Sequence, residues 1–284
     1  MKRVVRWAAR LFLLVLLALG LVMGLLAGCQ DKLIFPAASS QGQPYAQHRP
    51  LAGDVQFTVI SAAGDEVVGL FIPAKRPTST PAPTLLMFYG NGQWLADAAF
   101  IGRAFAARGM NVAVMEYPGY GLSTGRASEA AIYAAADAFY KHVADLADVE
   151  AASIVPVGWS LGAAAAMYIA HRQNTPGVVL LTPFTSLPDM ADRLIPLLPV
   201  RWLVKYDFDN TSRIAEYPGR VFIGYADRDR LIPSRMPLAL AESAGDRATV
   251  YAVEGADHNT LFHTGGTALP AAIAAFVRQT TDAR

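Results

Sequence analysis

The sequence has little cysteine and little charge, and it has no repeat or low-complexity tract in its main part. The one cysteine among 284 residues, Cys29, excludes an internal disulfide, and the absence of Cys/His metal spacings excludes a zinc module. Charged residues make up 17% of the chain and hydrophobic residues 53%, which excludes a disordered chain. The formal net charge of +1 offers no basic field for nucleic acid. A chain of this length can bury one large core or two small ones.

Acidic side chains are missing from the start of the chain, where the first is Asp31. Four basic residues, Lys2, Arg3, Arg6 and Arg10, precede an unbroken apolar and small-residue run over 11–28. A basic flank followed by an apolar run has the layout of a secretory signal. Residues 1–28 are therefore predicted to be a signal peptide, and the rest of the chain is mildly acidic.

The apolar run ends in Leu26-Ala27-Gly28-Cys29, which resembles the bacterial lipobox. The resemblance implies cleavage before Cys29, a lipid on its sulfur and an acylated new N-terminus, such as a palmitate, which would hold the protein in the bacterial cell envelope. Gln30 follows, rather than the aspartate that often marks inner-membrane retention. Two alternatives stay open: an uncleaved transmembrane helix, since about 17 to 25 apolar residues can span a bilayer, and an ordinary cysteine.

Residues 29–54 are rich in Ser, Gln, Pro and Gly and are predicted to be a tether, within which 32–36 is apolar enough to dock on the domain. Residues 55–284 form the predicted domain, in which short β-rich runs alternate with longer helical patterns. The predicted strands are 55–60, 67–73, 84–89, 111–116, 153–158, 177–181, 220–225 and 248–253, and the predicted helices are 94–108, 128–146, 161–172, 234–244 and 266–279.

This alternation predicts an α/β fold with a mostly parallel central sheet and helices on both faces. Residues 183–218 break the rhythm, because they are long, interrupted by prolines and partly helical. Pro156 does not fit a central strand, because proline removes a hydrogen bond from the ladder. In such sheets chemistry takes place at the carboxyl ends of the strands, so the residues that follow each strand are the candidates.

Ser160 lies in a Gly-x-Ser-x-Gly sequence between a predicted strand and an Ala-rich helix. Gly158 and Gly162 permit a tight turn that lifts the hydroxyl above the sheet, at the positive end of the helix. A serine hydroxyl is a poor nucleophile near neutral pH and needs a base and an orienting acid. Ser160 is therefore predicted to be the nucleophile; the alternative is an ordinary Gly-Ser turn.

His258 is the predicted base, because it follows the strand 248–253, and His263 is its rival. The other three histidines lie in the tether or on predicted helices: His48, His142 and His171. If the chain order is Ser…Asp…His, the acid lies between the two. Asp227 and Asp229 follow the strand 220–225 and compete for that role, and a solvated charged turn is the alternative reading of both.

An oxyanion hole needs backbone N–H donors, each worth roughly 10²–10³ in rate. The predicted donors are the N–H of Leu161, directly after the nucleophile, and that of Asn91, in the loop after the strand 84–89, with Gly92 as the alternate.

These residues and the motifs around them resemble those of the α/β-hydrolases, and the resemblance covers nearly the whole chain after Cys29. The resemblance is to the small-cap branch that includes bacterial lipoprotein and eukaryotic membrane-anchored ABHD-type hydrolases. It implies that Asp229, four residues before Pro233, is the acid rather than Asp227, and that 183–218 is a cap. The segments that carry it are 32–36, Tyr117-Pro118-Gly119-Tyr120-Gly121-Leu122-Ser123, Gly158 to Gly162, Thr182-Pro183-Phe184-Thr185-Ser186-Leu187, Asp229 to Pro233 and Gly255-Ala256-Asp257-His258-Asn259.

Two positions depart from the pattern of that family. Tyr89-Gly90-Asn91 stands where His-Gly-Asn is usual, which puts the anchoring of the oxyanion loop and the activity level in doubt. Glu116 stands where aspartate is more usual, and we expect this change to affect a structural hydrogen bond rather than the chemistry.

The expected function is that of a serine carboxylesterase or lipase-like hydrolase that needs no metal or organic cofactor. The apolar residues of 183–218 favour a small-molecule or lipid-like ester, or a thioester, with an apolar acyl chain. A peptidase of the serine aminopeptidase type is the second reading of the same residues. A catalytically inactive, membrane-tethered binding lipoprotein is the third.

Overall fold

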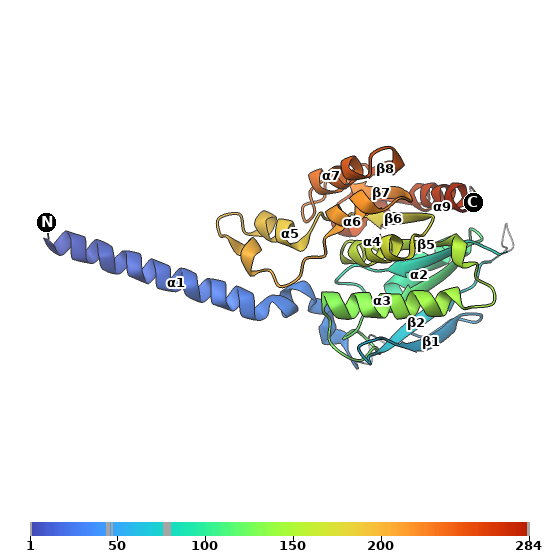
Figure 1. Ribbon diagram of the computed structural model, residues 1–284, viewed down its shortest axis with the longest axis horizontal. Coiled ribbons are helices and arrows are strands. Elements are labelled where there is room, and N and C mark those ends of the chain that lie inside the picture. Colours follow the sequence, from blue (N-terminus) through green and yellow to red (C-terminus); the bar gives the residue numbers. More distant parts are fainter. Residues whose placement is uncertain (1, 44–45, 47, 76–80, 283–284) are drawn as a thin grey trace.

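The computed structural model describes residues 2–43, 46, 48–75 and 81–282, and these form one eight-stranded sheet with helices on both faces (Figure 1). The strand order is β1-β2-β4-β3-β5-β6-β7-β8. Strands β3 to β8 are parallel, whereas β1 and β2 form an antiparallel edge. The bounds of the strands are β1 Val55–Ile60, β2 Glu66–Ile72, β3 Thr84–Phe88, β4 Asn111–Met115, β5 Ile154–Trp159, β6 Gly177–Leu181, β7 Arg220–Ala226 and β8 Ala248–Val253.

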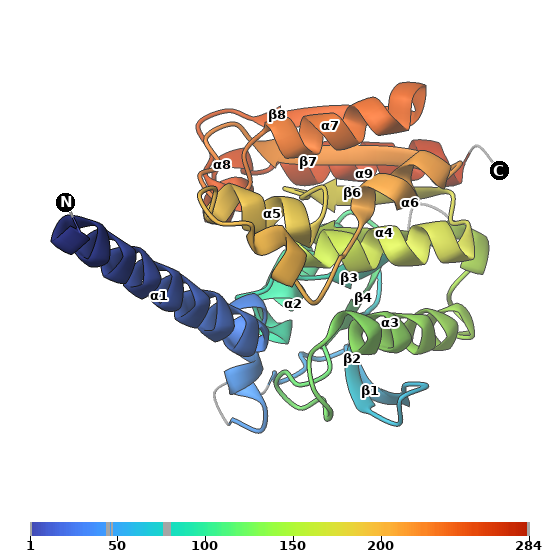
Figure 2. The same ribbon diagram turned by 60° about the vertical axis from the view of Figure 1, so that its left-hand side comes forward.

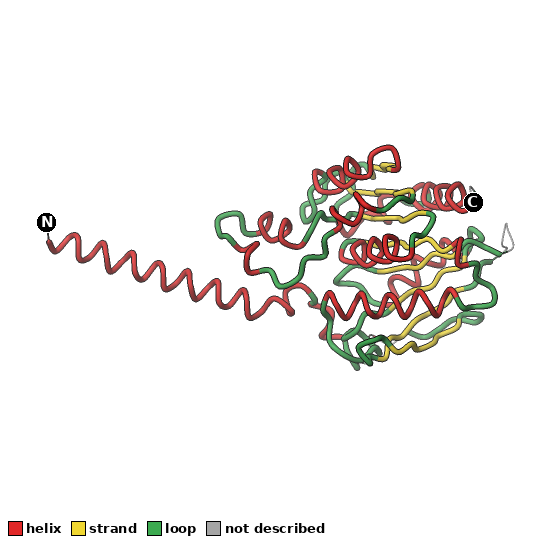
Figure 3. Tube along the Cα trace, in the orientation of Figure 1, coloured by secondary structure: helices red, strands yellow, loops and turns green. Residues whose placement is uncertain are grey.

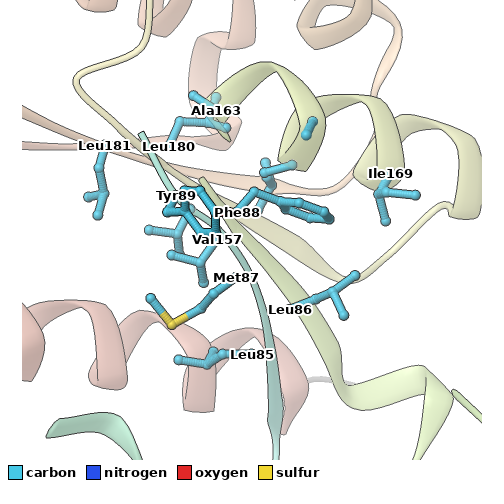
Figure 4. Close-up of a cluster of buried hydrophobic side chains, with 14 of the residues drawn as sticks. Leu85, Leu86, Met87, Phe88, Tyr89, Val157, Ala163, Ile169, Leu180 and Leu181 are labelled. Atoms are coloured by element: carbon cyan, nitrogen blue, oxygen red, sulfur yellow. The ribbon is translucent and has the colours of Figure 1, made fainter. Parts of the chain in front are cut away.

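The sheet is covered on both faces because its central strands are continuous apolar runs, and every residue of β3, β4 and β6 is buried. Helices α2 and α9 cover one face, and α3, α4 and α7 cover the other (Figures 1 and 3). Figure 4 shows side chains of β3, β5 and β6 meeting those of α4 in the core. The bounds of these helices are α2 Leu95–Ala106, α3 Glu129–Ala144, α4 Leu161–Gln173, α7 Arg235–Ala244 and α9 Ala268–Thr281.

The chain reverses its direction of winding between β3 and β5. After β3 the next parallel strand, β4, lies on one side of it, whereas β5, β6, β7 and β8 follow on the other. In sheets with this order, a crevice is expected between the loops that leave the carboxyl ends of β3 and β5, because these loops diverge. Both the predicted nucleophile and the predicted oxyanion loop follow these two strands.

The predicted α/β-hydrolase fold and its mostly parallel sheet are confirmed, and the bounds of the predicted strands and helices differ from those of the structure by at most two residues. Pro156 lies in a central strand, but β5 pairs with β6 only from Val157 onward. On the other side Pro156 faces Leu86 of β3 in the regular register. The proline therefore lies before the first residue of β5 that pairs with β6. Its missing N–H for this reason removes little stability from the sheet.

The segment 183–218 contains two helices, α5 Leu187–Leu194 and α6 Asn210–Glu216, and a short 3-10 turn, η4 Val200–Leu203. Ser186 begins α5 by accepting a hydrogen bond from the N–H of Asp189, and Asp209 caps α6 in the same way. Figure 2 shows α5 beyond the carboxyl edge of the sheet, on the side from which α1 leaves the domain.

Helix α1 covers Lys2–Ile34 and continues through Cys29 without a break. A short 3-10 turn, η1 Pro36–Ser40, follows it. Phe35 is buried against the rings of Tyr206 and Phe208, and Gln41 donates to the carbonyls of Ser123 and Gly125. At Phe35 and Gln41 the segment expected to be a tether is thus in contact with the domain. Two smaller elements, η6 His258–Thr260 and α8 Leu261–Gly265, lie between β8 and α9, and η3 Ala151–Ser153 and η5 Gly245–Arg247 precede β5 and β8.

Candidate active site

Ser160 lies on a strained turn between β5 and α4. Its φ of 54° is in a region that side-chain-bearing residues rarely adopt, and its N–H is held by the carbonyl of Leu181 at 2.9 Å. The glycines at ±2 are required by sterics: a Cβ on Gly158 would overlap the Gly162 carbonyl, and one on Gly162 would overlap the Phe88 carbonyl. The sequence folds this way because only glycine lets α4 begin so close to β3 and β5.

One chain of hydrogen bonds links Ser160, His258 and Asp229. The Ser160 Oγ lies 3.1 Å from Nε2 of His258. The Nδ1 of the same ring lies 2.7 Å from Oδ2 of Asp229. The three side chains come from the ends of β5, β7 and β8, because parallel strands bring their carboxyl ends to one edge of the sheet.

The Asp229 side chain is held from three directions. Its Oδ1 accepts the N–H groups of Leu231 at 2.9 Å and Ile232 at 2.7 Å, which leaves Oδ2 for the histidine. Only 1% of its side-chain surface is exposed. Its rival Asp227 is exposed on the same loop. The geometry therefore couples Asp229, not Asp227, to His258.

A second aspartate, Asp257, connects the loop that carries His258 to the loop that carries Asp229. Asp257 accepts hydrogen bonds from the N–H of His258 at 2.8 Å and of Arg230 at 3.2 Å, and it also pairs with the Arg230 guanidinium. These bonds, the one from His258 first, lower the pKa of the Asp257 carboxyl to about 2. Sequence reasoning missed Asp257 and Arg230, although the Asp-His dipeptide and the Arg-Asp-Arg turn were visible.

The other histidines lie away from this chain of bonds. His263 is exposed, and His142 stacks on Phe57 with ring centroids 4.2 Å apart. His171 lies 3.2 Å from Glu216 on the outer face of α4.

The predicted oxyanion donors lie on the two sides of the crevice. Leu161 is the first residue of α4, so its N–H is one of those that a helix leaves without an internal acceptor. Across the crevice, Gly90 lies directly beside Ser160, since a Cβ on Gly90 would be 3.7 Å from the serine Cβ. Asn91 follows Gly90, and its side-chain Oδ1 accepts the Tyr120 hydroxyl at 2.9 Å.

Three tyrosines support the Asn91 loop. The Tyr117 hydroxyl donates to the Tyr89 carbonyl at 2.6 Å, and the rings of Tyr89, Tyr117 and Tyr120 pack with centroids 4.6 to 6.4 Å apart. Tyr89 therefore anchors its loop as a buried ring. Burial, helped by the nearby Glu116 carboxyl, raises the pKa of the Tyr89 phenol well above its usual value and keeps the phenol neutral.

Comparison with known proteins places the chain among enzymes of this architecture. Residues 86–208 match the model of the alpha/beta hydrolase family. An uncharacterized protein of Mycobacterium tuberculosis is 30% identical over 242 residues, which cover 81% of this chain and 85% of the relative. The chain belongs to the alpha/beta hydrolase family.

Two solved structures of other proteins share the fold. An esterase of Pyrococcus furiosus superimposes with a TM-score of 0.66 at 14% identity, over 80% of this chain and 93% of the other. The protein Est1E of Butyrivibrio proteoclasticus gives the same TM-score and identity, over 81% of this chain and 99% of the other. At such identity the likeness concerns the fold alone.

Cys29 is exposed on α1, outside the crevice, in this member of the family. The apolar part of α1 has no residue buried in the protein and is long and apolar enough to cross a membrane, a test that signal sequences also pass. The roles predicted for Cys29, Ser160, His258, Asp229, Leu161 and Asn91 stay predictions at this point.

Glu116 is a buried carboxyl behind the tyrosines. It is 1% exposed, and its Oε2 accepts the N–H of Leu122 at 2.7 Å, while the Ser123 hydroxyl donates to its backbone carbonyl at 3.0 Å. It thus braces the loop that carries Tyr117 and Tyr120. Burial raises the pKa of its carboxyl from 4.5 to about 7.

Glu116 makes stability depend on pH. Because the pKa is raised in the folded state, its contribution to stability is fully present below pH 4.5 and is lost as the pH rises to about 7. Glu116→Gln removes the ionisation, so we expect its melting temperature to fall less than that of the wild type over this range. The measurement is thermal unfolding of the detergent-solubilised protein from about pH 4 to about pH 8. Glu242→Gln, at an exposed position on α7, is the matched control and should keep the wild-type slope. An unchanged slope in Glu116→Gln would contradict the assignment.

Proposed function

We propose that the protein is a serine hydrolase that cleaves carboxylic esters or thioesters with apolar acyl chains through an acyl-enzyme intermediate. The observation that carries the proposal is the continuous hydrogen-bond chain from the Ser160 Oγ through both nitrogens of His258 to Asp229. Such a chain supplies a nucleophile, a base and the group that orients the base.

In the proposed reaction the Ser160 oxygen attacks the ester carbonyl carbon as its proton passes to Nε2 of His258. The charge that builds on the carbonyl oxygen is stabilised by the N–H groups of Leu161 and Asn91. Asp229 accepts the Nδ1–H and stabilises the imidazolium. The tetrahedral intermediate then expels the alcohol, which takes the proton from His258. Water, deprotonated by the same ring, attacks the acyl group and releases the carboxylic acid and free Ser160.

The substrate preference rests on the segment 183–218, which we assign as a short cap. Its inner residues are apolar, with Met190 and Val200 buried and Leu187 packed against the core. The Pyrococcus furiosus protein that shares this fold is an esterase, and as part of the proposal we extend that substrate class to this chain.

The same proposal includes export. Residues 1–28 act as a lipoprotein signal, Cys29 carries the lipid, and the domain from residue 55 onward is held in the bacterial cell envelope as a lipoprotein member of the small-cap branch. The basic residues at the far end of α1 support an N-terminus on the cytoplasmic side and a domain on the other.

The catalytic assignment predicts the activity of single variants on p-nitrophenyl esters of graded chain length. The wild-type chain should hydrolyse them and favour longer acyl groups, because the cap is apolar. Ser160→Ala should lower kcat by about 10⁴-fold or more, since the nucleophile is lost. Asp227→Asn is the matched control for Asp229→Asn: the first should keep nearly full activity and the second should not.

The readout of that experiment is the initial rate of p-nitrophenol release, with amino-acid p-nitroanilides assayed in parallel. Turnover of the anilides without the esters would favour the peptidase reading and contradict ours. Full activity in Ser160→Ala would contradict both readings.

The anchor assignment predicts the mass of the mature N-terminus. Protein purified from a bacterial membrane fraction should lack residues 1–28 and carry lipid on Cys29, whereas Cys29→Ala should stay unprocessed. Intact-mass and N-terminal peptide spectrometry measure this directly. An unmodified chain that begins at Met1 would contradict the lipoprotein assignment.

A further inference from the structure

The segment 194–203, called the cap tip from here on, exposes three large apolar side chains. Leu194, Leu197 and Trp202 are 57%, 93% and 82% exposed. They come from the end of α5, the following turn and η4. Single exposed apolar residues are ordinary, but three on one projecting segment indicate a surface that meets an apolar phase.

The cap tip is joined to the end of α1 by polar contacts. The Gln30 side chain donates to the Leu203 carbonyl at 2.7 Å and accepts the N–H of Lys205 at 2.8 Å. One residue on, Asp31 accepts the Tyr206 hydroxyl at 2.7 Å and pairs with Lys205 at 3.4 Å. Gln30 and Asp31, near the end of α1, thus fix that end of the helix to the base of the cap tip.

These contacts set the level of a bilayer relative to the cap. The apolar run over 11–28 is about 27 Å long as a helix, close to the roughly 30 Å of a bilayer core. After Cys29 come the polar residues Gln30, Asp31 and Lys32. If the chain is cut before Cys29 instead, the lipid on that cysteine enters the bilayer at the same point. Either anchor puts the membrane surface within about one helical turn of Gln30.

The apolar surface continues from the anchor to the cap. A groove between the end of α1 and the cap is lined almost entirely by apolar atoms, among them those of Leu33, Met190, Ile195 and Val204. Figures 1 and 2 show α1 leaving the domain on the side where α5 projects. The cap tip therefore faces the space that the membrane occupies.

We propose that the cap tip docks on the lipid bilayer that holds the anchor, with Leu197 and Trp202 in its interfacial layer. Tryptophan suits this place, because its ring is apolar and its N–H stays among polar headgroups. The docking depends on the anchor and the cap surface alone, and it does not require the proposed hydrolase chemistry.

The test is quenching of Trp202 fluorescence by brominated lipid. The full chain carrying Trp7→Phe, which removes the tryptophan of α1, is reconstituted in liposomes with or without brominated phosphatidylcholine. The difference between this protein and the same protein with Trp202→Phe gives the emission of Trp202. We expect brominated lipid to remove most of that emission and aqueous iodide to remove little of it. A Ser160→Ala version should behave identically.

The matched control is Val55→Trp in the Trp7→Phe, Trp202→Phe background. Val55 is also exposed, at 56%. It is the first residue of β1, in the antiparallel edge of the sheet, and lies away from the carboxyl ends of the parallel strands. Its added emission should be quenched by iodide and not by brominated lipid. The proposal is overturned if Trp202 responds as Val55→Trp does. It is equally overturned if Trp202 is shielded from both quenchers, which would indicate a second protein molecule as the occupant.

Discussion

The close approach of helix α4 to strands β3 and β5 is the constraint on which the site depends. Gly158 and Gly162 let the first turn of the helix touch the backbone of the neighbouring strands. With the helix at that distance, Ser160 is forced to φ 54° and its hydroxyl stands clear of the sheet. The strain is held by the surrounding packing and by the bond from the Ser160 N–H to Leu181.

Two loops far from α4 in the sequence complete the site, and hydrogen bonds between them set their relative position. Arg230 and Asp257 join the loops after β7 and β8, so that Asp229 and His258 reach each other with little freedom left. An imidazole held in this way presents Nε2 to the Ser160 hydroxyl without a search over rotamers. On the opposite side of the crevice, buried phenols and the braced Glu116 hold the Asn91 loop. Residues outside the hydrogen-bond chain of Ser160, His258 and Asp229 thus hold the arrangement from both sides.

Much of this arrangement could be predicted from the sequence. The alternation of apolar runs and helical patterns was enough for the fold, because each central strand is buried on both faces. The position of Ser160, Asp229 and His258 after strands was enough to predict that they lie at one edge of the sheet.

The order of strands in the sheet was not predictable, since it depends on long-range pairing that no local pattern encodes. Nor was the role of Pro156, which depends on where β6 begins to pair. The contacts of Gln30 and Asp31 with the segment 183–218 join residues more than 170 positions apart, so the sequence allowed a docking prediction only for 32–36, from its apolar residues.

The central claim is that Ser160 is a nucleophile activated by His258. It is tested most directly by locating the adduct of a fluorophosphonate, which phosphonylates activated serines with loss of fluoride. The reconstituted full chain is incubated with the reagent, digested and mapped by peptide mass spectrometry. Our account predicts one adduct, on Ser160, and its loss in His258→Ala although the serine is still present. An adduct on a different residue, or equal labelling of Ser160 without His258, would contradict it.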